Sequence, residues 1–121
     1  MTPEALAAFT ARLEHWRIAY GLHEWRLVVQ EDAEQVHCLV TPDIQYLRAV
    51  VRVSPSFPEK DMEACAQHEM AHVLLAEFSA WAATVLQYVG ERASDPLHDA
   101  WELAWERTTE RVARLLTGGA A

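Results

Sequence analysis

Two histidines and one glutamate near the middle of the chain have the types and spacing of a metal-dependent hydrolytic site. His68, Glu69 and His72 form the sequence His-Glu-x-x-His. On a helix, residues four apart lie one turn apart on the same face, so both imidazoles can bind one ion. Neutral imidazole suits Zn²⁺, and the bound ion lowers the pKa of a coordinated water to about 7. The carboxylate of Glu69 would stand beside that water and could act as its general base.

The residues around this motif predict a buried helix. Residues 63–78, EACAQHEMAHVLLAEF, contain no proline or glycine, and apolar or small side chains surround the polar ones. A helix with a wide apolar surface and two neighbouring histidines is typical of a buried helix that presents ligands to a cleft. The alternative interpretation is two ordinary helix histidines beside a solvated glutamate.

A catalytic zinc site needs a third protein ligand and one open position. In the metzincin pattern a glycine and a histidine follow within about six residues, but Leu75 and Phe78 occupy those positions, so that pattern does not apply. A glutamate from a later helix would give a site of two histidines and one glutamate, whereas His98 would give three histidines. The carboxylates that the last helix offers are Glu102, Glu106 and Glu110.

Two segments carry a resemblance to a known group of enzymes. Residues 67–76 (QHEMAHVLLA) and 105–116 (WERTTERVARLL) resemble the small single-domain gluzincin-like metallopeptidases of phage and bacterial genomes, and are similar to the ImmA/IrrE-like group and the minigluzincins. The order of N-terminal helix, three-stranded sheet, active-site helix and glutamate helix also matches. The resemblance implies a zincin-like fold and a zinc-dependent endopeptidase that acts on peptide or protein substrates.

The same resemblance ranks the candidates for the third ligand. In the thermolysin pattern, a small hydroxyl residue follows the ligand glutamate at the third position, and an acid that orients a ligand histidine follows at the fourth. Glu106, Thr109 and Glu110 fit this frame. Glu102 fits it less well, because Trp105 stands where the small residue should be. The metal ligands that the resemblance implies are His68, His72 and Glu106.

Hydrophobic periodicity and turn residues predict one α+β domain over residues 1–121. An N-terminal helix is expected to begin at Thr2 and Pro3 and to stop near Gly21. Three short strands joined by short loops predict a small, mainly antiparallel sheet. The expected strands are residues 23–30, 36–40 and 46–53. The helices expected after the sheet are residues 59–76, 78–89 and 96–116.

Composition excludes several classes of function. The net charge of −8 argues against nucleic acid as a partner, because phosphate contacts need clustered lysine and arginine. No apolar run reaches the roughly 18 residues of a membrane span, and the first residues lack the apolar core of a signal peptide. Cys38 and Cys65 lack metal-binding or redox spacing, so we expect a reduced, cytoplasmic setting.

The resemblance also implies how a substrate would bind. It would lie extended along a sheet edge, for which the strand 46–53 is the candidate. The candidates for an additional oxyanion donor are Tyr46, Tyr88 and His98. Two other readings stay open: a latent zinc-binding protein whose cleft its own terminus or a homodimer blocks, and a purely structural interaction module. Glu69 favours an active enzyme, because a role limited to metal binding does not need the base.

Overall fold

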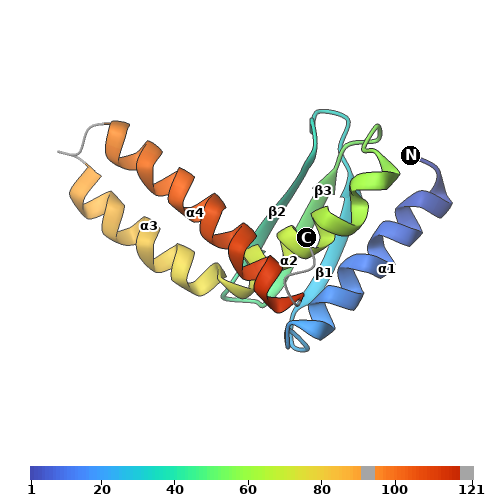
Figure 1. The fold of residues 1–121 in the computed structure, drawn as a ribbon, viewed down its shortest axis with the longest axis horizontal. Coiled ribbons are helices and arrows are strands. Elements are labelled where there is room, and N and C mark those ends of the chain that lie inside the picture. The colour runs from blue at the N-terminus through green and yellow to red at the C-terminus, as the bar shows by residue number, and fades with distance from the viewer. Residues whose placement is uncertain (91–94, 118–121) are drawn as a thin grey trace. The chain divides into compact units, whose positions relative to one another are not determined.

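The structure is a computed structural model that describes residues 1–90 and 95–117, apart from the side chains of residues 86, 88–90 and 95–98. These residues form an α+β fold of four α-helices, one short 3₁₀ helix and a three-stranded sheet (Figure 1). The chain divides into two compact units, Met1–Leu74 and Leu75–Ala121. The first holds the sheet and the second holds two helices. The expected α+β class is therefore confirmed.

Helix α1, Pro3–Ala19, begins and ends as its sequence predicts. The Oγ1 of Thr2 accepts a hydrogen bond of 3.0 Å from the backbone N–H of Ala5, which satisfies one of the open donors of the first turn. Pro3 takes the first helical position, where its missing N–H is not needed. Gly21 adopts a φ of 77°, the left-handed conformation that commonly ends a helix.

The sheet is mixed, so the expectation of a mainly antiparallel sheet was wrong. Its strands are β1 (Arg26–Glu31), β2 (Cys38–Asp43) and β3 (Arg48–Val53), in the order β1-β3-β2. Strand β3 pairs antiparallel with β2 but parallel with β1.

Hydrogen bonds of the connections explain this arrangement. The segment between β1 and β2 passes the end of β3, where Asp32 donates to the carbonyl of Val53 and Ser54 donates to that of His37. A tight turn then returns the chain from β2 to β3, with Asp43 Oδ1 accepting the N–H groups of Gln45 and Tyr46. The hairpin therefore places β3 in the middle of the sheet.

All three strands begin two or three residues later than predicted, β1 at Arg26 and β2 at Cys38, and β1 and β2 also end later. Two of the differences in strand bounds have identifiable reasons. Strand β3 begins at Arg48 and not at residue 46, because Leu47 takes a φ of 51° in the turn. Strand β2 continues through Pro42, which was expected to end it. Since β2 is an edge strand, proline is tolerated where its nitrogen faces away from the neighbouring strand.

Helix α2, Met62–Leu74, follows the short 3₁₀ helix Glu59–Asp61 and packs against α1 and β2. It ends before residue 76, and α3 begins there as a separate helix. The largest side chains buried completely in this unit come from both helices and the sheet. They are Phe9, Leu13, Val51, Val53, Met70 and Val73. A continuous apolar core thus fixes the position of α2.

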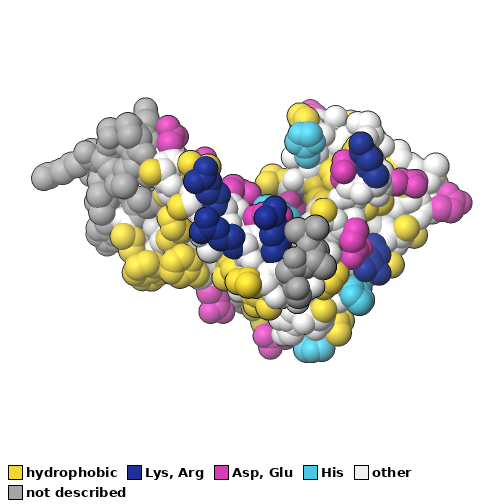
Figure 2. Space-filling view, viewed as in Figure 1, with side chains coloured by type: hydrophobic (Ala, Val, Ile, Leu, Met, Phe, Trp, Pro, Cys, Tyr) yellow, Lys and Arg dark blue, Asp and Glu magenta, His cyan; other side chains and the backbone are white. Residues whose placement is uncertain are grey.

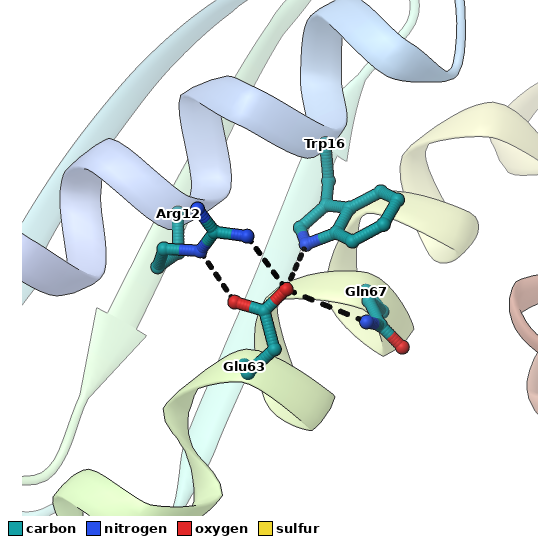
Figure 3. Close-up of polar contacts among 4 residues, drawn as sticks. All are labelled: Arg12, Trp16, Glu63 and Gln67. Atoms are coloured by element: carbon teal, nitrogen blue, oxygen red, sulfur yellow. Dashed lines mark hydrogen bonds and ion pairs between the residues drawn. The ribbon is translucent and has the colours of Figure 1, made fainter. Parts of the chain in front are cut away.

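A polar cluster joins α2 to α1 beside this core (Figure 3). The carboxylate of Glu63 accepts hydrogen bonds from the guanidinium of Arg12, from Trp16 Nε1 at 2.9 Å and from Gln67 Nε2 at 3.5 Å. The hydrogen bond from Arg12 is the largest cause that lowers the pKa of Glu63 below its ordinary value, and it outweighs the opposing effect of burial. The cluster fixes the first turn of the helix that carries the histidines.

The second unit contains α3 (Ala76–Gly90) and α4 (Asp95–Leu116). Phe78 of α3 stacks with Trp105 of α4 at a ring distance of 6.4 Å, and Trp101 stacks with Trp105 at 5.7 Å. Apolar side chains gather over α3 on the face that Figure 2 shows, and Phe78 and Trp81 are 54% and 63% exposed. In the part of the chain that the structure describes, no helix has the length and apolarity needed to cross a membrane.

Candidate metal centre

Helix α2 places two imidazoles together. The ring centroids of His68 and His72 lie 4.8 Å apart with the planes at 83°, and a ring nitrogen of each lies within 4.8 Å of the other. Two nitrogens bound to one tetrahedral zinc at 2.0–2.1 Å would be separated by about 3.4 Å. The separation in the structure is at most about 1.4 Å larger than this, and both side chains are half-buried. The pair therefore fits as two of the ligands of a zinc ion.

Glu69 lies on the same helix but is held by the sheet. Its side chain is only 7% exposed, and its Oε2 accepts a hydrogen bond of 3.2 Å from the backbone N–H of Val40 in β2. Because this N–H points away from β3, it belongs to the outer edge of β2. The carboxylate is thus fixed between the edge strand and the helix, one residue from His68.

Sequence reasoning missed a second group of possible ligands. The thiols of Cys38 and Cys65 and the carboxylate of Glu69 offer three ligand atoms within 4.8 Å of one another. Cys65 precedes Glu69 by one helical turn, and Cys38 precedes Val40 by two residues, so each pair shares a face of its element. The sequence shows both spacings, but it does not show that α2 packs against β2.

The environment of Cys65 raises the pKa of its thiol. A hydrogen bond with the thiol of Cys38 is the largest cause, and burial is the second. The negative charges of Glu69, Asp61 and an ionised Cys38 add to the effect. An uncompensated thiolate is therefore disfavoured at this position.

The candidates for the third ligand lie in the second unit, on α4. The side chains of Glu102 and Glu106 are exposed, while Glu110 is half-buried and forms an ion pair with Arg114 at 3.3 Å. Thr109 is completely buried and donates its hydroxyl to the carbonyl of Trp105 at 2.8 Å. The small hydroxyl residue of the proposed frame therefore stands at a buried position.

Two buried residues of α4, Thr109 and Ala113, lie near Glu106 along the helix. Trp105 packs on Phe78 of α3, and Trp101 stacks on Trp105. Glu106 lies on another side of α4 from these two tryptophans. However, Thr109 and Ala113 are also buried, and positions three and seven residues after Glu106 lie on its own side of the helix. Glu106 itself is exposed, and Thr109 also lies one turn after Trp105, near the tryptophan side of the helix.

Two other predictions have different outcomes. The strand 46–53 cannot offer an edge to a substrate, because β3 is hydrogen-bonded on both sides; this expectation was wrong. Of the candidate oxyanion donors, Tyr46 lies in the turn between β2 and β3 and is 68% exposed. The side chains of Tyr88 and His98 lie outside the described part of the structure.

No family model, curated protein sequence or solved structure matches this chain. The gluzincin resemblance therefore rests on the motifs of two helices. The geometry of α2 and its neighbours is the physical basis on which a function can be proposed.

Proposed function

We propose that this protein is a zinc-dependent peptidase in which His68, His72 and Glu106 bind the metal and Glu69 is the general base. The observation that carries the proposal is the combination of two facing imidazoles with a buried carboxylate fixed beside them. A pair of ordinary surface histidines would not need a buried acid between them and the sheet. Burial of a carboxylate has a free-energy cost that a functional or paired group must offset.

Each side chain would have a separate task. Zinc, when bound, supplies a Lewis acid that polarises the peptide carbonyl and acidifies water. Glu69 would take a proton from the attacking water and deliver it to the leaving amine. The N–H of Val40 would hold the carboxylate in place between these two steps, because it binds one of the two carboxylate oxygens.

Glu106 is proposed as the third ligand on the frame that it forms with Thr109 and Glu110. The buried position of Thr109 agrees with the frame, which has a small residue at this place. Glu110 carries a carboxylate that could accept the second N–H of a ligand histidine, which would fix its tautomer and raise its basicity. His98 and Glu102 remain the alternatives.

Strand β2 replaces β3 as the candidate edge for an extended peptide. Its outward groups include the N–H of Val40, which Glu69 already uses, and Pro42, which has no N–H to offer. A substrate strand would therefore pair mainly with carbonyl oxygens of β2 and would supply the donors itself.

A second candidate function is a metal-binding interaction protein with little hydrolytic activity. The exposed aromatic side chains of Phe78 and Trp81 favour it, because contiguous apolar surface is typical of protein-binding sites. A homodimer that uses this surface would be one form of the latent state.

The test is the zinc content of purified wild type, Glu106→Ala and the matched control Glu102→Ala, measured without chelators. We expect about one zinc per chain at the histidine site in wild type and Glu102→Ala, and clear loss in Glu106→Ala. The zinc affinity of Glu106→Ala should fall by more than the roughly 10–100-fold that follows when only a hydrogen-bond partner of a metal ligand is removed. Zinc retained by Glu106→Ala but lost by Glu102→Ala would assign the ligand to Glu102.

Zinc binding alone does not distinguish the two candidate functions. A peptide library incubated with zinc-loaded wild type and Glu69→Gln separates them. Cleavage by wild type that Glu69→Gln lacks would establish the peptidase. No cleavage by either protein, with zinc bound in both, would favour the interaction protein.

A further inference from the structure

The thiols of Cys38 and Cys65, which the proposed peptidase site does not use, form a group with Glu69. Cys38 is the first residue of β2, and Cys65 lies one turn before Glu69 on α2. Both cysteines are half-buried, neither is in a disulfide, and all three residues belong to the first compact unit. The packing of α2 on β2 brings them together from distant parts of the sequence.

The separation of the three ligand atoms favours one chemistry over another. They lie within 4.8 Å of one another. Two sulfurs bound to one tetrahedral metal at about 2.3 Å would be about 3.8 Å apart, whereas a disulfide needs about 2.05 Å. Because 4.8 Å is an upper limit, the sulfurs need to move by about 1 Å at most to share a metal ion, and they are not joined as a disulfide.

The charges around the thiols also favour a cation. Glu69 and Asp61 are acidic neighbours that disfavour a lone thiolate at Cys65. The same negative charges attract a divalent ion, which neutralises two thiolates at once. Soft thiolate ligands select thiophilic metals such as Zn²⁺, whereas Mg²⁺ and Ca²⁺ prefer oxygen ligands.

We propose that Cys38, Cys65 and Glu69 form a second metal site that binds a thiophilic divalent cation such as Zn²⁺ or Cd²⁺. On binding, each thiol releases its proton to solvent and donates a sulfur lone pair to the ion, and Glu69 adds one carboxylate oxygen. The fourth position is left to water. The site is separate from the histidine pair, although the two sites share the helix α2.

One consequence rests on the proposed function. When Glu69 binds this second cation, its carboxylate is no longer available as the general base, so an excess of thiophilic metal would inhibit hydrolysis. Metal binding itself does not depend on that function. A binding experiment that uses neither activity nor the histidine ligands can therefore fail independently of the peptidase proposal.

The probe is Cd²⁺, because thiolate-bound Cd²⁺ gives an ultraviolet charge-transfer band that imidazole and carboxylate ligands do not give. The protein is the full chain carrying His68→Ala and His72→Ala, which removes the histidine pair with a good helix former. Anaerobic titration with a phosphine reductant keeps the thiols reduced. We expect about one Cd²⁺ per chain, with the band rising to saturation at one equivalent.

Three further variants in this background assign the ligands. Cys38→Ser and Cys65→Ser should each weaken Cd²⁺ binding at least about tenfold and reduce the band by about half or more, with unchanged circular dichroism. Glu69→Gln should keep the band but weaken binding, because a neutral amide oxygen is a poorer ligand. Cys65→Ala provides a second test if Cys65→Ser does not fold.

Two results would overturn the proposal. One is the absence of a charge-transfer band in the folded histidine-free protein, or a band that both single serine variants retain in full. The other is a thiol titration showing that Cys38 and Cys65 join as a disulfide under the reducing conditions, which would make the pair a redox site and not a metal site.

Discussion

The two compact units differ in how they bury apolar side chains. Met1–Leu74 encloses large residues from two helices and a sheet, among them Phe9, Leu13 and Met70. In Leu75–Ala121, the described residues that are buried are all small: Ala76, Ala82, Thr109 and Ala113. Among the described aromatic side chains of this second unit, Phe78 and Trp81 are exposed and Trp101 and Trp105 are half-buried, and basic side chains gather along α4 in Figure 2.

This difference bears on how a metal site could be assembled. The two histidines and Glu69 belong to the unit with a core, and Glu69 is held there by burial and by the N–H of Val40. The proposed third ligand belongs to a unit that has few large buried side chains of its own. Under the proposed function, two ligands and Glu69 come from the first unit and Glu106 comes from the second. Substitutions in each unit, together with zinc binding, can test whether the two units contribute in this way.

The general base should have the largest effect. Glu69→Gln should lower peptide hydrolysis by about 10²–10⁴-fold, the usual contribution of a positioned acid or base, and keep its zinc. Glutamine retains an oxygen that can accept the N–H of Val40, so the fold should be unchanged. The checks are kcat/KM on one peptide and zinc content. Wild-type turnover in this variant would remove Glu69 from the mechanism.

Zinc binding should stabilise the protein and should also protect the backbone amides of α4 from hydrogen exchange. At free zinc about 1,000 times above Kd, the free energy of unfolding should rise by about 4 kcal/mol. Hydrogen exchange should slow in both α2 and α4 of wild type, whereas α4 of Glu106→Ala should not respond. Protection limited to α2 in wild type would mean that the second unit supplies no ligand.

Core truncation should separate the two units. Leu13→Ala, in the core of the first unit, should lower the free energy of unfolding by about 2–5 kcal/mol. Leu115→Ala is the matched substitution at a side chain that is 77% exposed, and it should change stability by less than about 0.5 kcal/mol. Chemical denaturation measures both. Equal losses would show that Leu115 has a buried role that its exposure does not suggest.

The smallest effect concerns the cluster at the start of α2. The folded-state pKa of Glu63 is lowered from 4.5, mainly by the hydrogen bond from Arg12. Its contribution to stability is therefore present above about pH 4.5 and lost as the pH falls through the lower folded-state value. Because Glu63 is partly exposed, that contribution should be no more than about 1 kcal/mol.

Thermal unfolding from pH 6 to pH 3 tests this sign. The stability of wild type should fall more steeply than that of Glu63→Gln, which cannot titrate. Glu4→Gln is the matched control on an exposed residue, and it should follow wild type. A parallel decline of wild type and Glu63→Gln would contradict the assignment.

Much of the local structure could be predicted from the sequence. The cap at Thr2, the stop at Gly21 and the separate helices after the sheet all depend on contacts within a few residues. The close approach of the His68 and His72 rings follows in the same way from the pitch of a helix. Each of these features is decided by neighbours in the chain.

Long-range packing decided the rest. The central position of β3 depends on which strands pair, and alternating apolar residues do not specify a partner. Cys38 lies close to Cys65, and Glu69 accepts a hydrogen bond from Val40, only because α2 packs against β2 over a shared core. The amino-acid order was enough to define the motif and its helix. Only the tertiary fold buries Glu69 against an edge strand with two thiols beside it, because burial is a property of the whole fold and not of a segment.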